Sequence, residues 1–99
     1  MTRLLKADEI TRQLADLPDW QWDGDSLNCD VKAPTFPVAI QIVDEIAEVA
    51  EQMDHHPDID IRWRKLAFRL STHTAKGVTQ LDIELAHRID EIAREYGAR

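Results

Sequence analysis

The stretch DIDIRWRKLAFRL, residues 58–70, decides the fold, because apolar and polar side chains alternate along it in two runs. The apolar members of the two runs are Ile59, Ile61, Trp63, Leu66, Phe68 and Leu70. A period of two is typical of strands that bury one face, so the stretch predicts a hairpin of two antiparallel strands. We expect its turn near Arg64–Lys65, with Trp63 directly opposite Leu66.

An amphipathic helix is predicted before this hairpin, over residues 36–54. Its apolar side chains recur every three or four positions, and they are Ala39, Ile42, Val43, Ile46, Val49, Ala50 and Met53. Thr35 is a favourable N-cap, and Pro37 is tolerated in the first turn. Pro57 prevents the helix from continuing into the hairpin.

The remaining elements are predicted from the same kinds of signal. A short helix is expected over residues 6–16, and a last helix over residues 80–96. Trp20–Trp22 and Leu27–Ala33 read as a first hairpin around the turn residues Asp23–Asp25. The order helix, two strands, helix, two strands, helix indicates an α+β fold, αββαββα, with one four-stranded antiparallel sheet and the helices packed on one face.

Length and composition limit the class of protein. The chain has 99 residues and a mass of 11.4 kDa, which suits one domain spanning residues 1–99. Hydrophobic residues make up 43% and charged residues 31%, a balance that is typical of globular proteins and excludes disorder throughout. No run of about 18 apolar residues exists, so no membrane association is expected.

The charge balance and the cysteine content limit partners and compartment. Nineteen acidic residues against twelve basic ones give a net charge of −7. Because phosphate backbones attract basic patches, direct nucleic-acid binding is not expected, and a small ligand or a protein partner fits better. Cys29 is the single cysteine. This excludes an internal disulfide and a cysteine metal cluster, and favours the reducing cytoplasm.

Three of the four histidines lie close together in the sequence, at His55, His56 and His73. Extending the ladder of the second hairpin from its expected turn places position 56 opposite position 73. Cross-strand neighbours lie about 4.5–5.5 Å apart, so the register predicts a cluster of three imidazoles. A slip of one residue would turn His73 to the other face of the sheet.

Such a cluster suits proton transfer, because imidazole gains and loses protons near neutral pH. One ring can protonate a leaving hydroxyl while another takes a proton from nitrogen. Glu51 lies one helical turn before His55 and could orient or charge-balance an imidazole.

Simpler interpretations stand beside this one. His55 could be a cation that interacts with a helix C-terminus, and Asp82 could only cap a helix that begins after Thr79. A zinc site of three imidazoles and a water is the rival chemistry, but the adjacent His55 and His56 point in diverging directions. The tryptophans are typical of core or interface positions, and His87 is expected at the surface.

The spacing of the candidate residues resembles the signature of pterin-4a-carbinolamine dehydratases over about residues 4–95. The matching positions are Glu51, His55, His56, Pro57, Trp63, His73 and Asp82, within the strings DHHPDI, LSTH and GVT. The resemblance implies an αββαββα domain that forms dimers or tetramers. It also implies dehydration of 4a-hydroxytetrahydrobiopterin to quinonoid dihydropterin, without metal or cofactor, which recycles the cofactor of aromatic amino-acid hydroxylases.

Residue roles also follow from the resemblance. The implied acid/base residues are His55, His56 and His73. The implied substrate-binding residues are Glu51, Asp82, Trp20 and Pro57. The sequence departs from the family's usual pattern at Trp63, where tyrosine is more usual, at Lys76, where a small residue is common, and at Lys6, where a hydroxyl cap is usual.

The leading hypothesis is therefore a dehydratase that acts on a pterin in the cytoplasm as a homodimer or homotetramer. The alternative is a non-catalytic module that serves as a dimerisation or protein-binding cofactor of a transcription regulator. A zinc hydrolase built on the same histidines is the third hypothesis.

Overall fold

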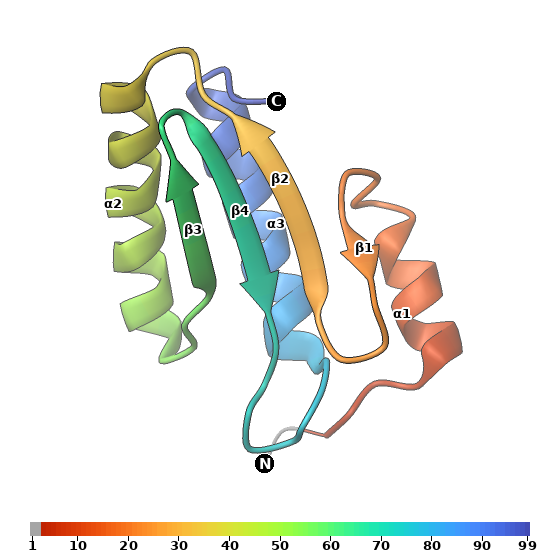
Figure 1. Ribbon diagram of the computed structural model, residues 1–99. Helices are drawn as coiled ribbons and strands as arrows, with labels where there is room; N and C mark the ends of the chain where they lie inside the picture. Colours follow the sequence, from red (N-terminus) through yellow and green to blue (C-terminus); the bar gives the residue numbers. More distant parts are fainter. Residues whose placement is uncertain (1–2) are drawn as a thin grey trace.

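The computed structural model describes residues 3–99, which form helices and strands in the predicted order (Figure 1). The elements are α1 (Ala7–Leu14), β1 (Gln21–Trp22), β2 (Leu27–Lys32), α2 (Phe36–Met53), β3 (Asp58–Arg62), β4 (Lys65–Leu70) and α3 (Gln80–Glu95). The four strands pair antiparallel in the order β1-β2-β4-β3. The prediction of an α+β fold with an αββαββα order is thus confirmed.

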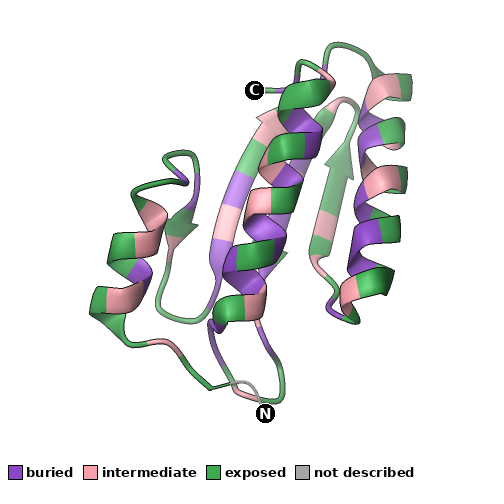
Figure 2. Ribbon diagram, turned by 180° about the vertical axis from the view of Figure 1, so that it is seen from behind, coloured by how far each residue is buried: buried purple, intermediate pink, exposed green. Residues whose placement is uncertain are grey.

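All three helices lie on one side of the sheet, and the opposite sheet face is left uncovered (Figures 1 and 2). Seen from behind, α3 runs along the middle of the sheet, with α2 and α1 on either side of it. The core fills the space between helices and strands, and its fully buried large members include Ile10, Leu27, Ile42, Ile46, Leu66, Phe68, Leu70 and Ile89. Along β4, every second side chain from Leu66 to Leu70 points into this core.

The long helices begin at the predicted caps. Thr35 Oγ1 accepts a hydrogen bond from the Val38 N–H at 3.2 Å, which satisfies one of the unpaired donors at the start of α2. At the start of α3, the Asp82 carboxylate accepts from the Thr79 N–H at 2.9 Å. Within residues 3–99, none of the helices is both long and apolar enough to cross a membrane.

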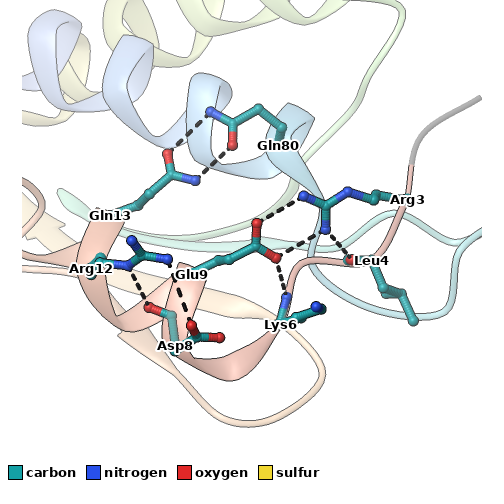
Figure 3. Close-up of polar contacts among 8 residues, drawn as sticks. All are labelled: Arg3, Leu4, Lys6, Asp8, Glu9, Arg12, Gln13 and Gln80. Carbon is teal, nitrogen blue, oxygen red and sulfur yellow. Dashed lines mark hydrogen bonds and ion pairs between the residues drawn. The ribbon is translucent and has the colours of Figure 1, made fainter.

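Polar contacts hold the start of α1 in place and link α1 to the start of α3 (Figure 3). Glu9 accepts hydrogen bonds from Nη1 and Nη2 of Arg3, at 2.9 and 2.8 Å, and from the Lys6 N–H at 2.8 Å. These bonds, that from Arg3 first, lower the pKa of Glu9 to about 2. The side-chain amides of Gln13 and Gln80 bond each other reciprocally, at 2.7 and 3.1 Å. Lys6 therefore begins the helix without a hydroxyl cap, because Glu9 caps its N–H.

The turn of the β3–β4 hairpin is not where the sequence predicted it. The turn residues are Trp63–Arg64, so that Arg62 pairs with Lys65 and Ile61 with Leu66. Trp63 adopts a left-handed conformation with φ 56°, which takes it out of the strand although it continues the apolar alternation. Extending the observed register puts position 56 opposite position 71, two residues short of His73. The predicted pairing of positions 56 and 73 was therefore wrong.

Candidate functional site

The end of α2 determines where His55 and His56 lie. Asp54 is left-handed, with φ 50° and ψ 44°, and its N–H bonds to the carbonyl of Glu51 at 3.2 Å. The N–H of His55 bonds back to the carbonyl of Ala50 at 3.0 Å. This left-handed stop is a common way to end a helix, and it turns the chain sharply toward β3. The two adjacent imidazoles consequently enter different environments.

His55 turns inward and meets α3. Its Nε2 lies 2.6 Å from Oδ1 of Asp82, and the two residues are 8% and 0% exposed. A buried carboxylate requires partners that satisfy its oxygens, and the histidine is one of them. Because a carboxylate only accepts hydrogen bonds, the proton in this contact is on Nε2 of His55. A neutral His55 in this arrangement carries its accepting lone pair on Nδ1.

Asp82 Oδ2 is held by two further donors. Thr72 Oγ1 lies 2.8 Å from it and the Thr79 N–H 2.9 Å, and the two threonine hydroxyls are 2.7 Å apart. All of these groups are buried. Asp82 therefore caps α3, as one interpretation predicted, and it also orients His55, whereas its implied role in substrate binding stays a prediction.

His56 turns outward and contacts Glu51 through its Nε2. Both side chains are largely exposed. Glu51, one helical turn before His55 in the sequence, was expected to orient or charge-balance an imidazole, and the ring that it contacts is that of His56. It does not contact His55, because α2 ends at Met53 and the left-handed Asp54 carries His55 away from the face that holds Glu51.

His73 lies in the turn that joins β4 to α3, and it is exposed. The turn is closed by a bridge between Thr72 and Gly77, and it contains Lys76 in a left-handed conformation with φ 59°. Figure 1 shows that the end of β4, the start of β3, the end of α2 and the start of α3 all lie at one end of the molecule. The three histidines therefore share one end of the fold, although His55 and His56 are separated there by their different partners.

Trp20 and Pro57 complete the set of predicted residues. Trp20 is buried in the core, where its ring stacks on Phe68 with centroids 6.5 Å apart and its Nε1 donates to Asp90 Oδ1 at 2.8 Å. Asp90 lies about two helical turns beyond Asp82 on α3, so the Trp20 indole contacts the sheet centre and not the His55 end. Pro57 is half-buried at the entry to β3 and follows the histidine pair directly.

Thr72 was not predicted as a site residue. Its position gave a signal, because it continues the even-numbered series Leu66, Phe68 and Leu70 that faces the helices. A polar residue at the end of such a series must find a buried partner. Over residues 3–99, no group of three or more His, Cys, Asp or Glu side chains is arranged to hold a metal ion.

Known proteins match most of the chain. A family model described as pterin 4 alpha carbinolamine dehydratase matches residues 3–92. A relative from Nocardia farcinica, named provisionally as a pterin-4-alpha-carbinolamine dehydratase, is 55% identical over 94% of this chain and 98% of its own length. A relative from Roseiflexus with the same provisional name is 50% identical over 92% of this chain and 97% of its own length.

Two solved structures share the fold. A Brucella melitensis protein, described as a transcriptional coactivator/pterin dehydratase, superimposes with a TM-score of 0.87. It is 33% identical, and the match covers 90% of this chain and 97% of that one. A pterin dehydratase-like protein identified as a RuBisCO assembly factor in the alpha-carboxysome has a TM-score of 0.65 at 19% identity, over 76% of this chain and 89% of that one. The second likeness concerns the fold alone.

Proposed function

Because this chain belongs to the pterin-4a-carbinolamine dehydratase family, we propose that it removes water from a 4a-hydroxytetrahydropterin by histidine acid/base catalysis. The single observation that supports this best is the buried contact of His55 Nε2 with Asp82 Oδ1 at 2.6 Å. It leaves Nδ1 as the basic atom of a ring that is held in place. Oriented bases of this kind typically accelerate proton transfer by about 10²–10⁴-fold.

The reaction requires one proton to be removed and one to be supplied. His55 Nδ1 takes the proton from N5 of the pterin, and the electron pair of that N–H bond forms the C4a=N5 double bond. The C4a–O bond breaks, and the departing hydroxyl takes up a proton and leaves as water. The products are a quinonoid dihydropterin and water, so no electron carrier is consumed.

The proton for the leaving hydroxyl comes from one of the two exposed histidines at this end of the fold. His56 has Glu51 as a carboxylate partner, whereas the His73 ring makes no side-chain hydrogen bond among residues 3–99. Glu51 and Pro57, next to the histidine pair, contribute to substrate binding, and the buried Asp82 contributes through the His55 ring that it holds.

Direct measurement tests this proposal. Freshly generated 4a-carbinolamine is mixed with the wild-type protein, His55→Ala, His56→Ala and His73→Ala, and loss of the carbinolamine is followed by absorbance. We expect wild type to exceed the spontaneous rate and His55→Ala to return close to it. A general acid must be protonated to act, so it causes the rate to fall at alkaline pH. The variant that loses this alkaline decrease, His56→Ala or His73→Ala, identifies the acid. Spontaneous rates for all four proteins refute the proposal.

A protein-binding role is the second candidate, because the Brucella melitensis structure is described as a transcriptional coactivator as well as a pterin dehydratase. For this chain, it predicts a stoichiometric protein partner together with spontaneous rates of dehydration. One zinc per chain in elemental analysis of the purified protein, with loss of turnover on chelation, would favour the zinc hydrolase instead.

The same proposal includes self-association in the cytoplasm and a place in tetrahydrobiopterin recycling. β3 is an edge strand of the sheet, and its exposed apolar side chain Ile61 lies next to the exposed Trp63. Unpaired edges of this kind pair readily with another chain. If two copies of β3 pair antiparallel about Asp60, Asp58 of each faces Arg62 of the partner subunit, while the two Asp60 carboxylates face each other, so the charges of the edge are only partly complementary.

A further inference from the structure

Thr72 occupies the centre of the buried polar network behind His55. Its hydroxyl contacts both Asp82 Oδ2, at 2.8 Å, and Thr79 Oγ1, at 2.7 Å. Its backbone N–H bonds to the carbonyl of Gly77 at 2.8 Å, and its carbonyl accepts the N–H of Ala75 at 3.0 Å. One residue thus holds both the turn that carries His73 and the carboxylate that contacts His55.

The direction of every proton in this network follows from the carboxylate. Asp82 only accepts, so Thr72 must give its single hydroxyl proton to Oδ2. Having donated that proton, Thr72 Oγ1 can only accept from Thr79, which must donate to it. The Thr79 N–H is the second donor to Oδ2. With both bonds in place, Oδ2 is fixed and Oδ1 is aimed at His55 Nε2.

We propose that Thr72 is a positioning residue that fixes His55 in the tautomer with the proton on Nε2 and the lone pair on Nδ1. Its relevance to turnover rests on the proposed dehydratase function, whereas its effect on the His55 ring does not. Removing the hydroxyl leaves Thr79 without its acceptor and Asp82 Oδ2 with one donor fewer. The carboxylate is then free to rotate, and the contact with His55 loses its fixed geometry.

The test compares Thr72→Val, which has the same shape without the hydroxyl, with Thr72→Ser, which restores it. Thr11→Val is the matched control, because the Thr11 hydroxyl bonds only to the carbonyl of Ala7 on the exposed side of α1. The ¹⁵N chemical shifts of the His55 ring, assigned with His55→Ala, report which nitrogen carries the proton. The same proteins are assayed for kcat and KM across pH.

In the wild-type protein, Thr72→Ser and Thr11→Val, we expect one tautomer with Nε2 protonated. In Thr72→Val we expect averaged ring shifts, together with a fall in kcat of about 10-fold at nearly unchanged KM, the equivalent of one hydrogen bond to a charged group. The acidic limb of its pH–rate profile, which reports the base His55, should also move. A Thr72→Val protein with wild-type ring shifts, or a Thr72→Ser protein as impaired as Thr72→Val, overturns the proposal.

Two further measurements keep the test decisive. If Thr72→Val does not fold, the wild-type protein alone is sufficient, because the hydroxyl protons of Thr72 and Thr79 should exchange slowly with water when each is held by a buried acceptor. Rapid exchange of both contradicts the network. If the wild-type protein shows no dehydration, the proposed function fails, but the ring shifts of the variants still decide the role of Thr72.

Discussion

The Nε2 of His55 and Oδ1 of Asp82 lie 2.6 Å apart, although 27 residues separate them in the chain. This contact joins the end of α2 to the start of α3 and gives the imidazole its orientation. We expect Asp82→Asn to reverse the tautomer of the His55 ring. The amide oxygen stays on the Thr79 N–H, so the NH₂ group of the asparagine turns toward His55. Nε2 must then accept, and the basic lone pair moves away from Nδ1.

For Asp82→Asn, kcat for carbinolamine dehydration should fall by about 10²–10⁴-fold, the usual contribution of a positioned base. Asp90→Asn is the matched control on the same helix, because an asparagine oxygen can still accept the Trp20 Nε1–H that Asp90 now accepts. The control should keep kcat within about twofold. Equal activity of Asp82→Asn and wild type would show that the orientation of His55 is irrelevant to turnover.

Lys76 gives a prediction about stability. It is exposed and left-handed, with φ 59°, a conformation that costs an ordinary L-residue about 1–2 kcal/mol and glycine very little. After allowance for the greater entropy of unfolded glycine, Lys76→Gly should raise the free energy of unfolding by about 0.5–1 kcal/mol. Urea titration measures this, and Lys76→Ala, which keeps the strained backbone, should show no comparable gain.

Cys29 should be unreactive in the folded protein. Burial, reinforced by the negative charges of Asp90, Asp19 and Asp30, raises its pKa to about 12. Ellman's reagent at pH 8 should therefore label the thiol slowly in buffer and rapidly in urea. Because the folded pKa lies above the unfolded value of about 8.5, stability should decrease as the pH rises from about 9 toward 12. Cys29→Ala should remove this part of the alkaline decrease, and an unchanged profile would contradict the assignment.

Asp23 should contribute to stability in an acid-sensitive way. Hydrogen bonds from the N–H groups of Asp25 and Ser26 lower its pKa, and Arg69 lies 3.2 Å from Oδ2. A lowered folded pKa gives stability that is present above the unfolded value of about 3.9 and is lost as the pH falls below it. In urea titrations at pH 7, Asp23→Asn should therefore have a lower free energy of unfolding than wild type. The difference between the two proteins should be smaller at pH 3. A difference that does not change with pH would exclude a role for the negative charge of Asp23.

The exposed edge of the sheet gives a prediction about assembly. Ile61 and Trp63 are 41% and 66% exposed on or beside β3. We expect the wild-type protein to be a dimer or larger in light scattering, and Ile61→Lys to shift it toward monomer by placing a charge on the paired edge. Leu4→Lys, which removes another exposed apolar side chain away from β3, is the control and should leave the mass unchanged. A wild-type monomer at high concentration would exclude this interface.

The sequence predicted the helices and the order of helices and strands along the chain well, because those depend on local patterns. The apolar stripe of α2 and the Thr35 cap recur in the structure as expected. The hairpin register could not be predicted from alternation alone. Trp63 continues the apolar pattern, yet it adopts a left-handed turn conformation, and nothing in a period of two distinguishes the last strand residue from the first turn residue.

The candidate site was predicted as a set of residues, and the one cross-strand pairing predicted within it, of positions 56 and 73, does not form. Asp82 was expected as a helix cap, but its contact with His55 depends on how α2 and α3 pack, which no local pattern reveals. Glu51 contacts His56, and not His55 one helical turn away, because the left-handed residue Asp54 interrupts the helical spacing. Trp20 was placed at the pocket by resemblance, whereas its hydrogen bond to Asp90 holds it within the core.

The left-handed turn at Asp54 means that a repeated residue in the sequence does not produce a repeated chemical group. Two identical rings follow each other along the chain, and one is enclosed against a carboxylate that fixes its proton while its neighbour faces water. A single peptide unit thus separates a buried ring with a set orientation from an exposed ring beside Glu51. For the proposed dehydration, this means that the base and one of the two candidate acids are neighbours in the chain but lie in unlike surroundings.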